Sequence, residues 1–213
     1  MPRKPAPVEE TLKRLHKAYP DARCTLDFKT RLELLVATVL SAQCTDVRVN
    51  LVTPALFKKY RSARAYAAAP LPALESAIRS CGFYHTKAKS IQGFCRAIVK
   101  KYGGRVPATM DELVALPGVG RKTANVVLGN SGSRPGGFVV DTHVKRVAAR
   151  LGWTSRTDPV WIEQDLNQLL PEQDWVRTGH ELIQHGRRLC VARKPRCRDC
   201  PLNDLCPSAF TFP

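Results

Sequence analysis

The clearest chemical pattern in this chain is a set of four cysteines spaced C-x6-C-x2-C-x5-C: Cys190, Cys197, Cys200 and Cys206. Seventeen residues that carry four thiols can wrap one compact metal centre, so the spacing indicates a bound metal or an iron–sulfur cluster. Six basic residues lie among or just before them: Arg187, Arg188, Arg193, Lys194, Arg196 and Arg198. A cationic loop held by a metal centre indicates contact with a polyanion.

A second pattern lies in the middle of the chain, where Leu-Pro-Gly-Val-Gly-Arg-Lys-Thr-Ala covers residues 116–124. Its two glycines allow a tight turn, and an apolar helix is expected to follow directly. The amides of Gly118, Val119, Gly120 and Arg121 are then expected to be unpaired beside the positive end of that helix. Such a site suits a DNA phosphate. The alternative is a plain tight turn between two packed helices.

The overall charge favours a nucleic-acid partner. Lys and Arg number 34 against 18 Asp and Glu, and the net charge of +16 fits the electrostatic footprint of a DNA binder. A basic protein kept soluble by its charge is the alternative. The length of 213 residues allows one large or two small domains, and a chain of this size does not need the metal merely to fold.

The other four cysteines are scattered through apolar, helix-like stretches: Cys24, Cys44, Cys81 and Cys95. Core packing is their expected role, because free cysteine is among the most buried residue types. The N-terminal residues lead into no apolar signal segment, and no apolar run is long enough to span a membrane. We therefore expect a reducing, cytoplasmic location and no membrane association.

Apolar residues recur at the helical period in segments that we expect to be helices: Glu9–Ala18, Arg31–Ser41, Val47–Tyr60, Pro72–Arg79, Lys87–Tyr102, Pro159–Leu170 and Trp175–Cys190. Pro54 is expected to kink or break its helix. Thr109 and Glu112 form a capping-box signature for a further helix. The turn-rich segment Asn130–Gly137 is expected to be a joint. The alternating strand pattern never exceeds Gly137–Val140, so the sequence predicts an all-α fold.

Four motifs together resemble the endonuclease III family of helix-hairpin-helix DNA glycosylases. They are the Leu116–Ala124 run, Val140-Asp141-Thr142-His143, the Leu40–Asp46 segment and the cysteine spacing. The motifs occur in the family's order, and the match covers nearly the whole chain. The resemblance implies two lobes. Residues 24–134 would form a six-helix barrel with the hairpin, and residues 1–23 with 135–213 a [4Fe–4S] cluster domain. The substrate cleft would lie between them.

The resemblance assigns catalysis to Lys122 and Asp141. An amine at position 122 would attack the sugar C1′ of a damaged nucleotide, expel the base and form a Schiff base. About one lysine in 2,500 is neutral at pH 7, so the surroundings must favour the neutral amine. Asp141 would help to activate the lysine and stabilise positive charge on the sugar. The alternatives are a phosphate-binding surface lysine and an aspartate that only caps a helix.

DNA contacts are expected from a wider set. The target nucleotide must leave the duplex, and Gln43 matches the family's gap-filling position. Phe83 lies where the family often has a leucine wedge; it could equally be a core residue. The remaining expected DNA contacts are Gly118, Val119, Gly120, Arg121, His85, Arg193 and Lys194. Ser41, Asp46 and His143 are expected to shape the base pocket or to hold the local fold.

The predicted function is a bifunctional DNA glycosylase with AP-lyase activity in base excision repair. Oxidised pyrimidines are the family's usual substrates, and β-elimination would cut the strand. The expected partner is double-stranded DNA with damaged or abasic nucleotides, bound by a nucleoid-associated monomer. An adenine-mispair glycosylase of the same superfamily and a non-catalytic, metal-stapled DNA-binding module are the alternatives. Spacing alone leaves zinc open beside the [4Fe–4S] cluster, since four thiolates also suit tetrahedral zinc.

Overall fold

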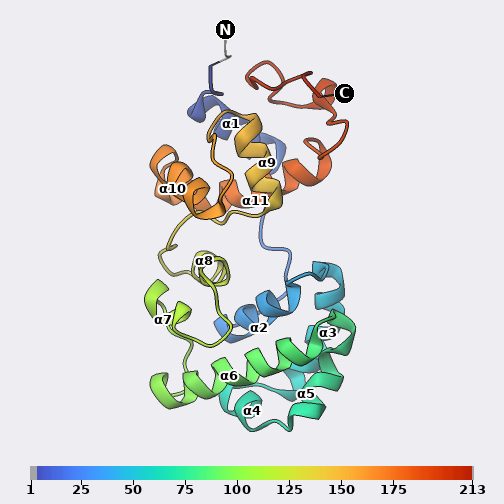
Figure 1. The fold of residues 1–213 in the computed structure, drawn as a ribbon, viewed down its shortest axis with the longest axis vertical. Coiled ribbons are helices and arrows are strands. Elements are labelled where there is room, and N and C mark those ends of the chain that lie inside the picture. The colour runs from blue at the N-terminus through green and yellow to red at the C-terminus, as the bar shows by residue number, and fades with distance from the viewer. Residues whose placement is uncertain (1–3, 213) are drawn as a thin grey trace. The chain divides into compact units, whose positions relative to one another are not determined.

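A computed structural model describes residues 4–212, and this range is all-helical, with no β-strand (Figure 1). The α-helices are α1 (Val8–Ala18), α2 (Arg31–Ser41), α3 (Asp46–Lys59), α4 (Ala63–Ala68), α5 (Leu71–Ile78), α6 (Tyr84–Tyr102), α7 (Met110–Val114), α8 (Arg121–Asn130), α9 (Thr142–Arg150), α10 (Pro159–Leu169) and α11 (Trp175–Arg188). Three short 3₁₀ turns are η1 (Arg79–Cys81), η2 (Glu172–Asp174) and η3 (Cys197–Asp199). The all-α prediction is confirmed.

Most of the expected helices are present, with shifts that have local causes. Of the two outcomes expected at Pro54, a kink or a break, the break is excluded because α3 continues through this residue to Lys59. Helix α6 begins at Tyr84, three residues before the expected start, because Phe83 turns the chain into the helix with a left-handed backbone. Helix α11 ends at Arg188 because the Leu189 and Cys190 amides both bond to the His185 carbonyl.

The chain divides into two compact units, each with its own core. Cys24–Gly136 forms one, called here the hairpin unit; residues up to Arg23 and from Gly137 onward form the other, called here the cysteine unit. The hairpin unit contains α2 to α8, and the cysteine unit contains α1 and α9 to α11. No residue of one apolar core belongs to the other.

Helix α6 is the spine of the hairpin unit. Its inward face is fully buried at Ala88, Ile91, Phe94, Cys95 and Ile98. Helices α4 and α5 pack against it, and the hairpin helix α8 packs on α2 (Figure 1). The helix ends at Gly103, whose positive φ of 62° provides the expected stop.

The other four cysteines behave as packing residues. Cys81 and Cys95 are buried in the hairpin core, and Cys24 and Cys44 pack against its edge. All are free thiols. Burial raises the pKa of Cys95 to about 12, which keeps its thiol protonated and unreactive at neutral pH. The expected core role of these cysteines is therefore confirmed.

The cysteine unit joins the start of the chain to its end. The Ala6 amide donates to the Leu151 carbonyl at 2.9 Å, and the Trp153 indole donates to the Ala6 carbonyl at 2.9 Å. These bonds hold the N-terminal segment beside the end of α9, and α1 also packs on α11. None of the helices in residues 4–212 combines the length and apolar character needed to cross a bilayer.

Candidate active site

The turn between α7 and α8 has the tight geometry that its glycines predict. Gly118 has a φ of +75°, and a Cβ at this position would lie 2.7 Å from the Ser90 hydroxyl of α6. Gly120 is the N-cap of α8, makes no side-chain capping bond, and has open space where its Cβ would point. Position 118 therefore needs glycine for steric reasons. The missing side chain at Gly120 leaves the start of α8 accessible to a ligand.

Val119 does not behave as expected within this turn. Its side chain is buried in the hairpin core, and its amide donates to the Leu116 carbonyl at 3.1 Å. The expectation that all amides from Gly118 to Arg121 are unpaired is therefore wrong for Val119. Because the turn closes on itself there, Val119 fixes the shape of the turn while its neighbours form the exposed rim.

Lys122 is the second residue of α8 and is exposed. It makes no hydrogen bond or ion pair with any described residue of the hairpin unit, so its amine can reach a ligand. Arg121 precedes it in the same helical turn and is also exposed. The Lys122 amine thus lies in the first turn of α8, directly after the glycine turn.

Asp141 lies in the cysteine unit, where it is the N-cap of α9. Its Oδ1 accepts hydrogen bonds from the amides of His143 and Val144, both at 2.8 Å. The predicted capping role is confirmed. Because both capping bonds end on Oδ1, Oδ2 has no partner among the described residues of this unit. The half-buried carboxylate is thus oriented by the helix and retains one open oxygen.

His143 is held by Arg146 one turn further along α9. The Arg146 guanidinium donates to His143 Nδ1 at 3.1 Å and to the Gly186 carbonyl at 2.8 Å. Since a guanidinium can only donate, Nδ1 is the acceptor and Nε2 carries the ring proton. Burial lowers the pKa of His143, which favours this neutral form; the charge of Asp141 acts in the opposite direction.

Two loops of the hairpin unit carry exposed side chains on left-handed backbone. Gln43 has a φ of +51° between α2 and α3, and Phe83 has a φ of +47° before α6. Both are exposed, and Phe83 retains 64% of its accessible surface. The core alternative for Phe83 is therefore excluded. Non-glycine residues rarely adopt this conformation, and such strain concentrates at binding and catalytic sites.

Lys87, which the sequence analysis missed, joins these two loops. It is buried, and its Nζ donates to the Leu40 and Cys81 carbonyls, both at 2.8 Å. Leu40 leads into the Gln43 loop and Cys81 leads into the Phe83 loop. Burial lowers the pKa of Lys87. The available signal was its position on the apolar face of α6, one turn before Ile91.

Three further site candidates make local bonds in the hairpin unit. The Ser41 hydroxyl donates to the Thr38 carbonyl at 2.9 Å, and Thr25 donates to Asp46 Oδ2 at 2.5 Å. His85 Nδ1 lies 2.9 Å from Glu75 Oε1, with most of the ring exposed beside the Phe83 loop. Ser41 and Asp46 thus hold the ends of α2 and α3, whereas His85 is presented to a ligand.

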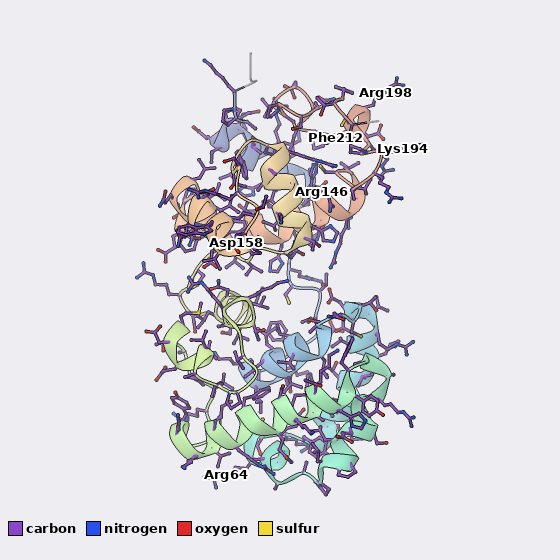
Figure 2. All side chains as sticks on the ribbon, viewed as in Figure 1. Arg64, Arg146, Asp158, Lys194, Arg198 and Phe212 are labelled. Atoms are coloured by element: carbon purple, nitrogen blue, oxygen red, sulfur yellow. The ribbon has the colours of Figure 1, made fainter. Side chains whose placement is uncertain are left out.

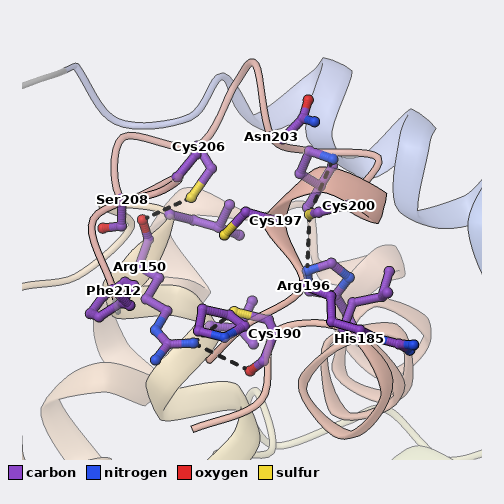
Figure 3. Close-up of a pocket in the computed structure, with 16 residues that line it drawn as sticks. Arg150, His185, Cys190, Arg196, Cys197, Cys200, Asn203, Cys206, Ser208 and Phe212 are labelled. Carbon is purple, nitrogen blue, oxygen red and sulfur yellow. Dashed lines mark hydrogen bonds between the residues drawn. The ribbon is translucent and has the colours of Figure 1, made fainter. Parts of the chain in front are cut away.

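Figure 3 shows the four C-terminal cysteines around one cavity of the cysteine unit. His185, Arg150 and Leu202 also line this cavity. No group of three or more His, Cys, Asp or Glu side chains in residues 4–212 is arranged to hold a metal ion. The four thiols therefore line a shared cavity.

Donors are directed at these thiols. Arg150 donates to Cys190 Sγ at 3.2 Å, and the Leu202 amide donates to Cys200 Sγ at 3.4 Å (Figure 3). Burial raises the pKa of Cys200 to about 11, and neighbouring thiols add to this shift. A bound metal would deprotonate such thiols, and the donors would then stabilise the thiolates. The donor set therefore fits a group that supplies positive charge.

Arg193 and Lys194 lie in the loop between Cys190 and Cys197, and both are exposed. Lys194 has a φ of +51°. Neither makes a hydrogen bond or ion pair with a described residue of the cysteine unit. The loop is anchored instead by Arg150, which donates to the Val191 and Ala192 carbonyls at 2.8 and 3.0 Å. Two unpaired cations on an anchored loop suit a phosphate ligand.

Comparisons with known proteins match this arrangement. The family model described as HhH-GPD superfamily base excision DNA repair protein matches residues 36–172. Endonuclease III of Synechocystis sp. is 54% identical over 200 residues, which cover 94% of this chain and 91% of the relative. The structure of a non-covalent endonuclease III–DNA complex has a TM-score of 0.89 at 45% identity and covers 96% of this chain and 95% of its own. A trapped endonuclease III–DNA covalent intermediate, an estranged-adenine complex, matches equally at 0.89 and 45%, with 96% of both chains covered.

Substitution of Gly118 tests the geometry of the turn. Gly118→Ala is expected to lower the free energy of unfolding by roughly 1–3 kcal/mol, since it strains the backbone and drives a Cβ into Ser90. DNA affinity should fall with it. Gly120→Ala, at a φ of −88° with open space, is the matched control and should change unfolding by less than about 0.5 kcal/mol. Equal losses in urea unfolding would contradict this account.

Lys87→Met tests the link between the two strained loops. The change leaves the Leu40 and Cys81 carbonyls without their donor, so we expect unfolding free energy to fall by about 1–3 kcal/mol. Affinity for an abasic-site duplex should fall by more than the increase in the unfolded fraction explains, because both loops lose their anchor. Lys101→Met, at an exposed position of the same helix, is the control. Unchanged affinity in Lys87→Met would show that the loops do not depend on this amine.

Proposed function

The chain belongs to the endonuclease III family of the HhH-GPD superfamily, and we propose that Lys122 and Asp141 are its catalytic residues. Membership makes it a DNA glycosylase with AP-lyase activity that acts in base excision repair. The observation that carries the residue assignment is the position of Lys122. It is an exposed amine in the first helical turn after the glycine turn, and it makes no hydrogen bond or ion pair with a described residue of the hairpin unit.

Lys122 is the nucleophile of the proposed reaction. Its neutral amine attacks the sugar C1′, a bond forms from Nζ to C1′, and the bond from C1′ to the damaged base breaks. The departing base takes the electron pair and a proton, and ring opening gives the Schiff base. Loss of a C2′ proton then expels the 3′ phosphate by β-elimination, which cuts the strand. Attack on C1′ requires the neutral form of this amine.

Asp141 assists through the oxygen that does not cap α9. The capping bonds from His143 and Val144 fix Oδ1, and Oδ2 is available to take a proton from the lysine or to face the sugar. A carboxylate oriented in this way stabilises positive charge that develops at C1′ without reorganising during the reaction. The proposal requires that Lys122 and Asp141 reach the same sugar.

The DNA substrate is proposed to be a duplex with a damaged or abasic nucleotide, oxidised pyrimidines above all. Gln43 and Phe83 occupy the space that the extruded nucleotide leaves, and His85 contacts the DNA beside them. Ser41, Asp46 and His143 border the base pocket. Gly118, Gly120, Arg121, Arg193 and Lys194 bind phosphates, while buried Val119 supports the turn. The enzyme acts as a cytoplasmic, nucleoid-associated monomer.

The four C-terminal cysteines are proposed to hold a [4Fe–4S] cluster. The four thiols line one cavity, and four cysteine thiolates are the ligand set of such a cluster. Cys190, Cys197, Cys200 and Cys206 would hold the cluster, and the basic loop between Cys190 and Cys197 would then be fixed at both ends. The cysteine unit is then the cluster domain, residues 1–23 with 135–213, and residues 24–134 are the six-helix barrel.

Borohydride trapping on an abasic duplex tests the nucleophile. The wild-type chain should form a covalent adduct, and Lys122→Gln should form none because it has no amine to make a Schiff base. Asp141→Asn should keep DNA binding and lower the single-turnover rate by about 100-fold or more. Lys101→Gln, at an exposed position of α6, is the control and should trap like wild type.

The trapping result also separates the alternative functions. A non-catalytic DNA-binding module, or an adenine-mispair enzyme that lacks this lysine chemistry, would give no adduct with the wild-type chain. An undiminished adduct in Lys122→Gln would assign the chemistry to another amine.

Metal analysis tests the cluster. The purified protein should absorb near 400 nm and contain about four iron and four sulfide ions per chain. Cys197→Ser should lose iron, whereas Cys24→Ser, which alters a packing cysteine of the hairpin unit, should keep it. A colourless protein with one zinc per chain would refute the cluster.

A further inference from the structure

The segment from the second residue of α3 to the first residue of α7 is almost free of acidic residues. From Val47 to Met110 the chain has twelve Lys and Arg but a single acid, Glu75, so this part of the hairpin unit repels cations and attracts anions. Glu75 itself lies 2.9 Å from His85. The positive charge of this segment is therefore not neutralised by acids within it.

Three of these cations share one face of α6. Lys89, Arg96 and Lys100 are spaced i, i+7 and i+11, which places them along one stripe of the helix. All three are exposed. The apolar residues Ile91, Phe94 and Ile98 occupy the opposite, buried face. The stripe spans eleven helical rises, about 16 Å, which is roughly the axial length of five base pairs.

Helix α4 extends this stripe. The Gln92 side chain donates to the Ala69 carbonyl at 2.7 Å, and Arg96 donates to the Ala67 carbonyl at 3.4 Å. Later residues of α6 thus pair with earlier residues around α4, so the two run antiparallel. Arg64 accordingly falls beside the last turn of α6, where Lys100 lies. Arg64 is exposed at the outer edge of the unit (Figure 2).

The same face of α6 meets the hairpin turn. Gly93 lies between Lys89 and Arg96 on the stripe, and its Cβ would lie 3.5 Å from Pro117. The adjacent Ser90 approaches Gly118. The exposed cations of α6 therefore begin where the proposed phosphate-binding turn ends. Lys89, Arg64 and Lys100 make no hydrogen bond or ion pair with a described residue of the hairpin unit, so they are available to a ligand.

We propose that Arg64, Lys89, Arg96 and Lys100 form a second phosphate-binding surface, the α4–α6 track, which holds duplex DNA outside the lesion. This rests on the proposed function, because the track continues the phosphate site of the hairpin turn. Each cation that neutralises a phosphate releases condensed counterions, which makes binding stronger and more dependent on salt. The track carries no base-reading geometry and acts on any sequence.

The test compares two triple variants with equal loss of charge. Arg64→Gln/Lys89→Gln/Lys100→Gln removes three of the four cations of the track. It keeps Arg96, whose guanidinium donates to the Ala67 carbonyl. Lys4→Gln/Lys13→Gln/Lys17→Gln removes three exposed lysines of the cysteine unit and is the control. The probe is a duplex of about 30 base pairs, on the order of 100 Å long, with a central tetrahydrofuran abasic-site analogue. Affinity is measured by fluorescence anisotropy over a series of KCl concentrations.

The track variant should lose about 2.7 from the slope of log affinity against log salt, at about 0.9 per phosphate contact. The ratio of the wild-type association constant to that of this variant should fall by roughly 40-fold when KCl is raised from about 50 to about 200 mM. The control variant should lose less than about 1 from the slope. The single-turnover rate at saturating enzyme should match wild type in the control variant.

Equal slope changes in the two triple variants would overturn the proposal, because net charge alone would then explain the binding. An unchanged slope in the track variant would overturn it as well. These results do not depend on catalysis. Failure of the wild-type chain to cleave an abasic duplex would instead refute the proposed function, whatever the salt slopes show.

Discussion

The proposed chemistry of this protein depends on the starts of two helices. Lys122 lies in the first turn of α8, and Asp141 caps the first turn of α9. At the first, an exposed amine directly follows the glycine turn; at the second, two amides orient a carboxylate and leave one of its oxygens without a partner among the described residues of the cysteine unit. The backbone therefore positions both side chains.

Two strained loops of the hairpin unit are held in place by buried hydrogen bonds close to them. Gln43 and Phe83 are exposed on left-handed backbone, which is unfavourable for side chains of their size. Lys87 offsets this by bonding the chain before both loops, and its own burial is compensated by two carbonyl acceptors. The cysteine unit has a parallel arrangement, where buried Arg150 bonds to the backbone and a thiol of the basic loop. In both units a buried cation holds a segment whose side chains are exposed.

The sequence predicted those features that a periodic or spacing signal carries. Helix α2 has the predicted bounds because its apolar period is regular, and Asp141 caps α9 as its residue type suggested. Helix α4 was missed because Ala63–Ala68 is short and mostly alanine, which gives no amphipathic pattern. The start of α6 was misplaced because its N-cap is Phe83, a residue with no capping side chain.

The sequence identified the residue types of the candidate site but not the contacts that these residues make in the fold. Glycine spacing indicated the turn before Lys122, yet the internal bond of the Val119 amide depends on how the turn closes on Leu116. The role of Lys87 was missed because a single charged side chain on an apolar face has no periodic signature. Its role follows only from the two carbonyls that tertiary packing brings to it.

The most direct measurement is mass-spectrometric mapping of the peptide that carries the borohydride-reduced sugar remnant after proteolysis of the wild-type adduct. A single modified residue, Lys122, is the predicted result. A remnant carried by any other amine of the chain would contradict the account at its centre.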